Sequence, residues 1–277
     1  MKNPNTFLIT GASQGLGLII VQQLLNAGKK VIATTRNAAT FDPEIKYHEN
    51  LEVISLDLTD ETSVASMIMD LKSRYSSLDV LINNAGFGFA GAIEEAQQDE
   101  VARVIELNVL ATIRMTRLVL PLMREQKKGH IINLSSNAGL VSSAGFGIYN
   151  ASKYAVEGFS EALLLEVNGL GIQVTLIEPG AFRTNFLAAS LAVSRISIGD
   201  YEPTAGLFKT RLNANNGSQP GDPVKAAEAI IGISEMESPP LRLLLGQDAY
   251  NRVTAKLKAV SLEIENMKQV TLSTDFN

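Results

Sequence analysis

The regular alternation of short apolar runs with longer amphipathic stretches constrains the fold of this chain more than any other feature. Runs rich in β-branched or large apolar residues occupy 7–10, 31–35, 51–56, 80–82, 130–134 and 172–177. Helical periodicity fills the intervals at 16–27, 63–75, 99–124 and 149–167, and a last helix over 223–236 precedes a seventh apolar run at 241–245. Such runs indicate strands buried on both faces. The alternation predicts an α/β, doubly wound Rossmann fold with a seven-stranded parallel sheet and helices on both faces.

One stretch, at about 185–221, departs from this alternation. Its periodicity is weak, and its end at 213–221 is rich in Asn, Gly, Ser and Pro, which predicts a mobile excursion. Its large apolar residues are Phe186, Leu187, Leu191, Val193, Ile196, Ile198, Tyr201, Leu207 and Phe208. They form either an apolar cover over an apolar ligand or the buried faces of one or two short helices. No linker or repeat divides the chain, so we expect residues 1–277 to form one domain.

Composition excludes several classes of protein and site. The 24 Lys and Arg against 29 Asp and Glu give a net charge of −5, which disfavours a nucleic-acid partner because binding phosphates needs a basic footprint. The absence of Cys removes disulfides and thiolate chemistry, and two His residues, His48 and His130, do not build a metal centre, so we expect no metal.

Neither a signal sequence nor a membrane span is expected. Residues 1–5 lack the basic and apolar segments of a secretory signal. The charge-free run at 131–152 is too rich in Asn, Ser and Gly for a spanning helix. These features predict a cytoplasmic protein.

A glycine-rich turn joins the first predicted strand to the first helix. Gly11, Gly15 and Gly17 follow a G-x-x-x-G-x-G spacing, with Ser13, Gln14 and Leu16 between them. Glycines let the backbone approach a pyrophosphate, and the start of the helix offers free N–H groups and a positive dipole. The turn indicates dinucleotide binding; the alternative is a tight strand–helix turn that binds nothing.

The end of the second strand bears on which dinucleotide binds. An NAD site usually carries an acidic side chain there for the ribose 2′-hydroxyl, whereas this chain has Arg36, which can pair with a 2′-phosphate. This favours NADP(H), unless Arg36 is merely a solvent-exposed residue. NAD(H) use stays possible, because no second basic residue stands beside Ser13 and Gln14 in the glycine turn.

Two residues on the predicted helix over 149–167 are candidates for proton transfer. Tyr149 and Lys153 are four apart and share a helix face. An ammonium beside a phenol lowers the pKa of the phenol toward neutral pH, which makes it a usable acid or base. Ser136 ends one predicted strand and Asn84 follows another, so both belong to the edge where ligands of such sheets bind. Local turn hydrogen bonding is the alternative role for each.

Taken together, these motifs resemble those of the short-chain dehydrogenase/reductase family. The matching residues, in family order, are Thr10 to Gly17, Asp57, Asn83 to Gly86, Asn108, Ser136, Tyr149, Lys153 and Pro179-Gly180. The resemblance covers roughly 6–184, and within the family the sequence around Arg36 and at 241–246 looks most similar to the hydroxysteroid-dehydrogenase-like branch. It implies hydride transfer between NADP(H) and a carbonyl or alcohol substrate.

The resemblance also implies roles for individual residues. Tyr149 is the general acid or base, Ser136 binds the substrate oxygen, Lys153 holds the nicotinamide ribose, and Asn108 holds a water that links Lys153 to solvent. The implied cofactor contacts are Gly11, Ser13, Gln14, Gly15, Leu16, Gly17, Arg36, Asp57, Leu58, Asn84, Ala85, Gly86, Tyr149, Lys153, Pro179, Gly180 and Thr184.

The family further implies a homodimer or homotetramer, built through the helices at 99–124 and 150–167. Two other functions remain as alternatives. A non-catalytic NADP-binding regulator would share the fold, although the intact Ser136, Tyr149 and Lys153 disfavour it. An adenosylmethionine-dependent methyltransferase also uses a glycine-rich turn, but it has no need for the Tyr/Lys pair.

Overall fold

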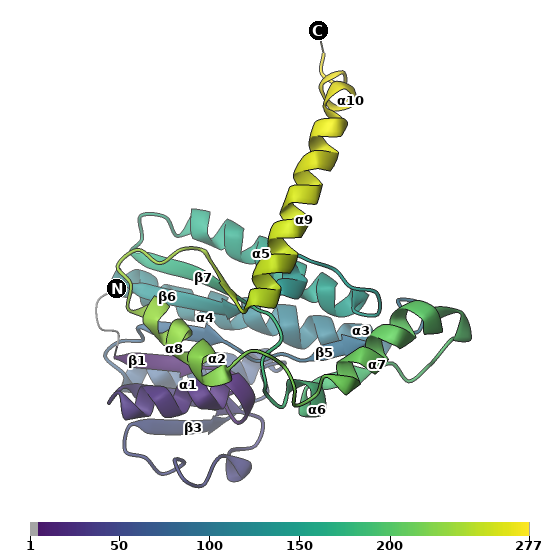
Figure 1. Ribbon diagram of the computed structural model, residues 1–277. Helices are drawn as coiled ribbons and strands as arrows, with labels where there is room; N and C mark the ends of the chain where they lie inside the picture. The colour runs from purple at the N-terminus through teal and green to yellow at the C-terminus, as the bar shows by residue number, and fades with distance from the viewer. Residues whose placement is uncertain (1–4, 277) are drawn as a thin grey trace.

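A seven-stranded parallel sheet forms the centre of the structure, a computed structural model that describes residues 5–276 (Figure 1). Residues 1–4, on which the expectation of no secretory signal partly rests, and Asn277 lie outside the described residues. The strands lie in the order β3-β2-β1-β4-β6-β7-β9. Their bounds are β1 Thr6–Ile9, β2 Lys30–Thr35, β3 Leu51–Ser55, β4 Val80–Asn83, β6 Gly129–Leu134, β7 Ile172–Pro179 and β9 Arg242–Leu245. The order reverses between β1 and β4, which is where such sheets bind dinucleotides.

Helices cover both faces of this sheet, as the alternation predicted. The bounds of the covering helices are α1 Gly15–Asn26, α8 Pro223–Ser234, α2 Glu61–Arg74, α4 Ala111–Gln126 and α5 Gly147–Glu166. In β1, Phe7 and Ile9 pack with α1 and α8 in one core. Leu8 points to the opposite face and packs with α2, α4 and α5 in the other. Because successive strand residues face opposite sides and both sides are covered, the central strands are mostly apolar, which explains the nearly continuous apolar runs.

Helix starts follow ordinary capping chemistry. The Asp60 side chain accepts hydrogen bonds from the backbone N–H groups of Thr62 and Ser63 and caps α2. Asp222 caps α8 in the same way, with Pro223 in the first turn, where a missing N–H has no cost. The predicted helix over 99–124 consists of α3, Gln98–Ile105, one π-helical turn at Glu106–Leu110, and α4.

Residues 185–221 contain short helices, as one of the two interpretations of this segment expected, and a strand that the sequence did not indicate. They include the short helix α6, Phe186–Ala189, the strand β8, Leu191–Val193, and the helix α7, Leu207–Ala214. β8 pairs in parallel with β5, Gly88–Ala90, to form a small second sheet. The pairing attaches this segment to the loop that follows β4.

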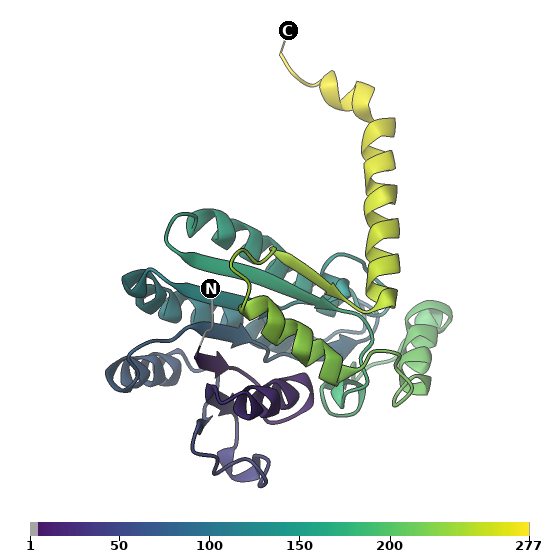
Figure 2. The same ribbon diagram turned by 60° about the vertical axis from the view of Figure 1, so that its left-hand side comes forward.

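The prediction that the helix at 223–236 is the last one is wrong. Beyond β9 the chain forms α9, Gln247–Asn266, and α10, Lys268–Leu272. Figures 1 and 2 show α9 projecting away from the layers of the sheet. Most side chains of α9 are exposed in the described part of the chain, so its sequence lacks the wide apolar face of a core helix and its pattern gave too little signal.

One buried imidazole makes a pH-dependent contribution to stability. His130 lies in β6, where its Nε2 is 2.9 Å from the Thr175 hydroxyl and where burial lowers its pKa to about 3. The unfolded chain binds a proton near pH 6.5 whereas the native state does not, so this contribution to stability is lost as pH falls from 6.5 toward 3.

We expect His130→Gln to reduce the loss of stability as the pH falls below 6.5. The wild type should lose about 3 kcal/mol more unfolding free energy than the variant between pH 7 and pH 4.5. Urea denaturation at several pH values measures this difference. Parallel pH profiles for the two proteins would contradict it.

Candidate active site

The glycine turn after β1 has the backbone geometry that its sequence predicted. Gly11 and Gly15 adopt positive φ angles of 63° and 58°, a region that disfavours side chains. A Cβ on Gly11 would lie 2.8 Å from the Cα of Ala85, and a Cβ on Gly17 would lie 2.5 Å from the Asn84 amide nitrogen. Both the backbone conformation and the close contact therefore require glycine at position 11, whereas at Gly17 the close contact alone requires it.

Asn84 supports this turn from the neighbouring strand end. Its side-chain Nδ2 donates to the carbonyl oxygens of Thr10 and Gly11, both at 2.9 Å. The Thr10 hydroxyl oxygen accepts hydrogen bonds from the N–H groups of Asn84 and Ala85, both at 3.0 Å. The Asn84 side chain thus stabilises the turn. A cofactor contact from this residue would therefore use its backbone.

Helix α1 begins at the glycine turn without a side-chain cap from its N-cap residue, which leaves the N–H groups of its first turn available to an anion. Gln14 is its N-cap residue, and no side chain caps the helix. The Gln14 Nε2 instead donates to the Ser190 hydroxyl at 3.2 Å. A Cβ on Gly15 would stand 3.9 Å from the Cβ of Thr184. The segment after β7 therefore lies against the glycine turn, with Thr184 beside the start of α1.

The next two strand ends carry Arg36 and Asp57. Arg36 is exposed directly after β2, and no ion pair is found for it within residues 5–276. Asp57 accepts hydrogen bonds from the Thr59 N–H at 2.9 Å and the Thr59 hydroxyl at 2.7 Å, which lowers its pKa, and the charge of Arg36 adds to the effect. The adjacent Leu58 is buried. Arg36 and Asp57 thus follow the ends of two neighbouring strands, β2 and β3.

Tyr149 and Lys153 lie buried on one face of α5. The Lys153 Nζ donates to the carbonyl oxygen of Leu134 at 2.7 Å and lies 5.8 Å from the centroid of the Tyr149 ring. A Cβ on Gly86 would be 3.8 Å from the same Nζ. The structure thus brings together the Tyr/Lys pair, the end of β6 and the turn after β4.

The pKa directions differ from the expectation for this pair. Burial raises the pKa of Tyr149 to about 12, and the Ser136 hydroxyl offsets part of that rise. Burial lowers the pKa of Lys153 to about 8, against a rise caused by Glu157. The expected lowering of the phenol pKa by Lys153 is absent from the protein alone, because the ammonium group binds the Leu134 carbonyl instead of the phenol. The phenol is therefore protonated at neutral pH.

Ser136 and the residues after β7 lie at the same edge. The Ser136 Oγ accepts a hydrogen bond from the Ala138 N–H at 3.1 Å and lies 3.4 Å from the carbonyl oxygen of Pro179. The Gly180 N–H donates a hydrogen bond to the carbonyl oxygen of Leu245 at 2.8 Å, and a Cβ on Gly180 would collide with the Asp248 side chain. The first turn of α9 therefore fixes the backbone that follows Pro179.

Asn108 sits in the π turn between α3 and α4 and is buried. Its Oδ1 accepts from the Phe87 N–H at 3.0 Å, while its Nδ2 donates to the Phe87 carbonyl at 2.9 Å and to the Ser152 hydroxyl at 3.1 Å. All polar atoms of the Asn108 side chain thus form hydrogen bonds that hold the chain next to Gly86. A water in this place would bind the backbone carbonyl oxygen of Asn108, which also accepts a hydrogen bond from the Thr112 hydroxyl.

Aromatic side chains surround the Tyr149 ring. Phe146 lies 5.1 Å away and Phe186, on α6, lies 6.1 Å away between ring centroids. Phe208, on α7, stacks edge-on against Phe146 at 4.7 Å. The segment 185–221 therefore supplies an apolar wall beside the phenol, whereas Val193 and Ile196 are exposed.

Sequence reasoning missed a buried acidic cluster behind Lys153. Glu157 is one turn further along α5, and Arg242 contacts it at 3.2 Å and Glu178 at 3.1 Å. Burial and the neighbouring Glu157 raise the pKa of Glu178 to about 8. The spacing of Glu157 from Lys153 was a readable signal, but nothing in the sequence indicated that β7 and β9 bring Glu178 and Arg242 to it.

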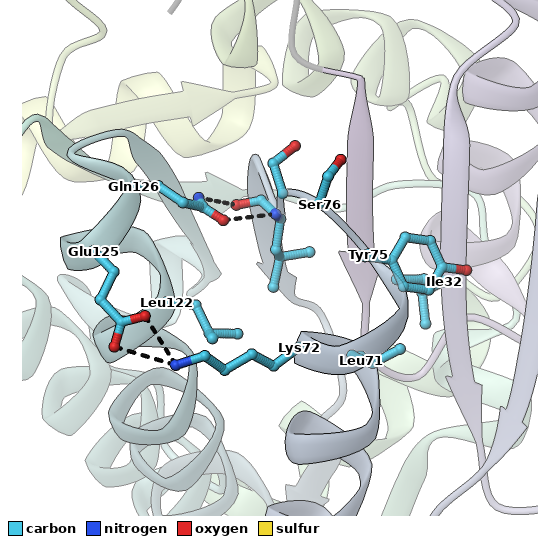
Figure 3. Close-up of a pocket in the computed structure, with 10 residues that line it drawn as sticks. Ile32, Leu71, Lys72, Tyr75, Ser76, Leu122, Glu125 and Gln126 are labelled. Atoms are coloured by element: carbon cyan, nitrogen blue, oxygen red, sulfur yellow. Dashed lines mark hydrogen bonds and ion pairs between the residues drawn. The ribbon is translucent and has the colours of Figure 1, made fainter.

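A separate cavity of about 260 Å³ lies at the opposite, amino end of the strands (Figure 3). It is lined by the ends of α2 and α4, including the Lys72–Glu125 ion pair, and by none of the candidate residues.

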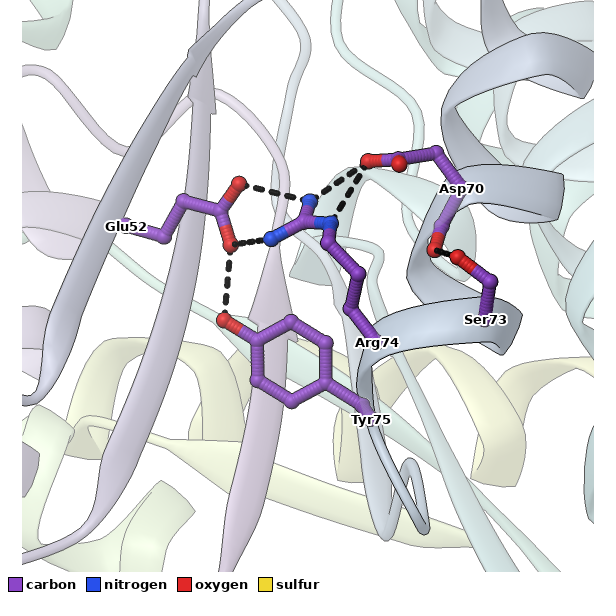
Figure 4. Close-up of polar contacts among 5 residues, drawn as sticks. All are labelled: Glu52, Asp70, Ser73, Arg74 and Tyr75. Atoms are coloured by element: carbon purple, nitrogen blue, oxygen red, sulfur yellow. Dashed lines mark hydrogen bonds and ion pairs between the residues drawn. The ribbon is translucent and has the colours of Figure 1, made fainter.

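Nearby, Arg74 binds Glu52 through two hydrogen bonds and also Asp70, which ties α2 to β3 (Figure 4). These contacts are structural.

Two classes of site can be assessed across the described residues. Between residues 5 and 276, no three His, Asp or Glu side chains are grouped to hold a metal ion. In the same part of the chain, every helix is too short or too polar to cross a membrane.

Comparisons with known proteins agree with this geometry. The family model of the short chain dehydrogenases matches residues 5–193. A 3-ketodihydrosphingosine reductase from Bacteroides thetaiotaomicron is 37% identical over 248 residues, 88% of each chain. The crystal structure of a short-chain dehydrogenase from Streptomyces avermitilis is 39% identical, with a TM-score of 0.92 over 98% of this chain and 100% of its own. A serine dehydrogenase bound to NADP+ is 29% identical, with a TM-score of 0.73 over 87% and 94% of the two chains.

Proposed function

The chain belongs to the short-chain dehydrogenase/reductase family of oxidoreductases, and from this premise we propose that it transfers hydride between NADP(H) and an apolar carbonyl or alcohol. Tyr149 is the general acid and base. The observation that carries the proposal is the meeting of Tyr149, Lys153 and Ser136 beside the glycine turn, at the carboxyl edge of the sheet. Within the family, we place the chain in the hydroxysteroid-dehydrogenase-like branch.

The residues of the chain have distinct roles in this reaction. Bound NADPH supplies the hydride that reduces the carbonyl carbon. The Tyr149 hydroxyl donates its proton to the carbonyl oxygen as the new C–H bond forms, and the Ser136 hydroxyl donates a hydrogen bond to the same oxygen. Lys153 binds the nicotinamide ribose and stabilises the phenolate that remains. In the oxidation direction, Tyr149 accepts the proton of the alcohol.

The cofactor is held by backbone and side-chain groups along the edge of the sheet. The N–H groups at the start of α1 bind the pyrophosphate, Asp57 and Leu58 border the adenine, and the chain from Asn84 to Gly86 follows the dinucleotide. Pro179, Gly180 and Thr184 border the nicotinamide. Arg36 pairs with the 2′-phosphate, which gives the preference for NADP(H) over NAD(H).

Arg36→Ala tests this preference. Because a charge-assisted hydrogen bond contributes about 1.5–3 kcal/mol, we expect NADPH to bind about ten- to a hundredfold more weakly and NADH to bind within about twofold of wild type. Fluorescence titration of both reduced cofactors measures the two affinities. Arg117→Ala, which removes another exposed Arg, is the control. Equal losses for NADPH and NADH would show that Arg36 is structural.

The aromatic wall formed by Phe146, Phe186 and Phe208 supports an apolar substrate. The Bacteroides relative, named for reduction of a 3-keto compound, supports a ketone. We propose that 185–221 covers the substrate within a single domain, and that the protein is cytoplasmic and forms a homodimer or homotetramer through the helices at 99–124 and 150–167, which are α3, α4 and α5.

A screen of NADPH oxidation against apolar ketones and aldehydes tests the proposed activity. Oxidation with at least one member of the panel supports it. Tight NADPH binding without oxidation of any of them would favour the alternative, a non-catalytic NADP-binding regulator.

A further inference from the structure

Helix α9 is anchored at its base and otherwise uncovered. Near its start, Ala249 and Val253 are buried against the body, and Arg252 donates to the Ser143 hydroxyl at 2.9 Å. Beyond Val253 the helix leaves the body, as both views show (Figures 1 and 2). A helix of this length in water needs packing of one face to be stable, because an isolated segment is marginal.

The uncovered part carries a narrow apolar stripe that continues from the buried base. Four residues past Val253 comes Leu257, followed by Val260, Ile264 and Met267, at steps of three and four; we call these four residues the α9 seam. Leu257, Ile264 and Met267 are 57%, 64% and 54% exposed, and Val260 is half-buried. Alternating steps of three and four are the spacing of the contact positions of a coiled coil. The α9 seam therefore has the pattern of a helix–helix interface, and no other helix among residues 5–276 covers it.

Charges along the projecting part of α9 are divided between its two halves. In the projecting part, Lys256 and Lys258 precede Val260, whereas Glu263 and Glu265 follow it; Asp248 and Arg252 belong to the anchored base. Within the described residues, neither Lys256 nor Glu263 forms an ion pair, and no opposite charge stands three or four positions from either. A helix with this division is complementary to a second copy of itself that runs in the opposite direction.

We propose that the α9 seam binds the α9 seam of a second copy in an antiparallel pair. The register that sets Leu257 against Val260 of the second copy also brings Lys256 beside its Glu263. Twofold symmetry repeats each contact, as a self-complementary interface requires. This interface is separate from the one expected through α3, α4 and α5, and it is independent of the proposed reaction.

The same charges disfavour a lipid surface as the occupant. Glu263 and Glu265 flank the α9 seam, and the whole chain carries a net charge of −5, so an anionic bilayer would repel the outer half of the helix. A membrane-binding helix instead concentrates Lys and Arg along its polar face.

A matched pair of substitutions tests the interface in the full-length protein. Ile264 lies in the α9 seam and is 64% exposed, whereas Leu262 lies on another face of the same helix and is 62% exposed. We expect Ile264→Ser to halve the mass measured by light scattering after size-exclusion chromatography at micromolar concentration, and Leu262→Ser to leave the mass unchanged. A monomeric wild type, or equal masses for all three proteins, would overturn the proposal.

A charge exchange tests the direction of the pair. Lys256→Glu and Glu263→Lys should each raise the dissociation constant of this interface about fivefold or more, and the double variant should restore it, because the exchanged charges meet again across the antiparallel pair. Sedimentation equilibrium measures these constants. A double variant as weak as the single variants would contradict the antiparallel register. Flotation of a monomeric wild type with phosphatidylglycerol vesicles would assign the stripe to a membrane instead.

Discussion

Replacing Tyr149 by Phe is expected to lower kcat by about three orders of magnitude, within the range that general acid–base residues contribute. The substitution removes one hydroxyl and keeps the ring, with its packing against Phe146 and Phe186. In the proposed site, the glycine turn and Arg36 supply most of the cofactor binding, so the NADPH dissociation constant should stay within about twofold of wild type. Steady-state rates and a fluorescence titration on the same preparation give both quantities.

The control is Tyr154→Phe, one position after Lys153 on the same helix. The Tyr154 hydroxyl donates to the Leu140 carbonyl at 2.6 Å, away from the Tyr/Lys pair, so its removal should leave kcat nearly unchanged. A Tyr149→Phe variant with a near-normal rate would refute the mechanism. The raised pKa of Tyr149 bears on the direction of proton transfer, because a phenol with a pKa of about 12 is in the form that donates a proton to a carbonyl oxygen at neutral pH.

Gly11→Ala is the second substitution for which we expect a large effect. An alanine there must adopt a φ near 63°, and its Cβ would lie 2.8 Å from the Cα of Ala85. To relieve that collision, the turn must move away from Ala85. This movement breaks the hydrogen bond from the Ala85 N–H to the Thr10 hydroxyl. If two backbone donors to the pyrophosphate are misplaced, NADPH binding weakens by about a hundredfold or more.

Gly28→Ala separates this steric effect from backbone strain. Gly28 has a similar φ of 70°, but no atom of residues 5–276 lies within 4 Å of its Cβ position. This variant should lose about 1 kcal/mol of stability from the left-handed conformation and keep its affinity for NADPH. Thermal melts and NADPH titrations of both variants make the comparison. Normal cofactor binding by Gly11→Ala would show that the close approach to Ala85 is not required.

The central layers were predictable because two constraints act locally. Strands buried on both faces are mostly apolar on both, as Phe7, Leu8 and Ile9 are, and helices between them show a longer period. The positive φ of Gly11 and the shared face of Tyr149 and Lys153 also follow from local geometry.

Contacts between distant segments were not predictable in the same way. The Asn84 amide serves the glycine turn because β1 and β4 are neighbours, and Arg242 reaches Glu157 and Glu178 only after β9 joins β7. The direction of the Tyr149 pKa shift depends on burial and on where the Lys153 ammonium binds, and neither is encoded in a spacing of four residues. Helix α9 was missed because its apolar stripe is too narrow for a helix that packs on a core.

Transfer of deuterium from NADPH labelled at C4 of the nicotinamide to an apolar ketone tests the central claim most directly. Mass spectrometry of the product should show one deuterium on the carbinol carbon with wild-type protein and about a thousandfold less labelled alcohol, at equal times, with Tyr149→Phe. Protein that binds NADPH tightly yet labels no alcohol across the carbonyl panel would contradict hydride transfer to that class of substrate.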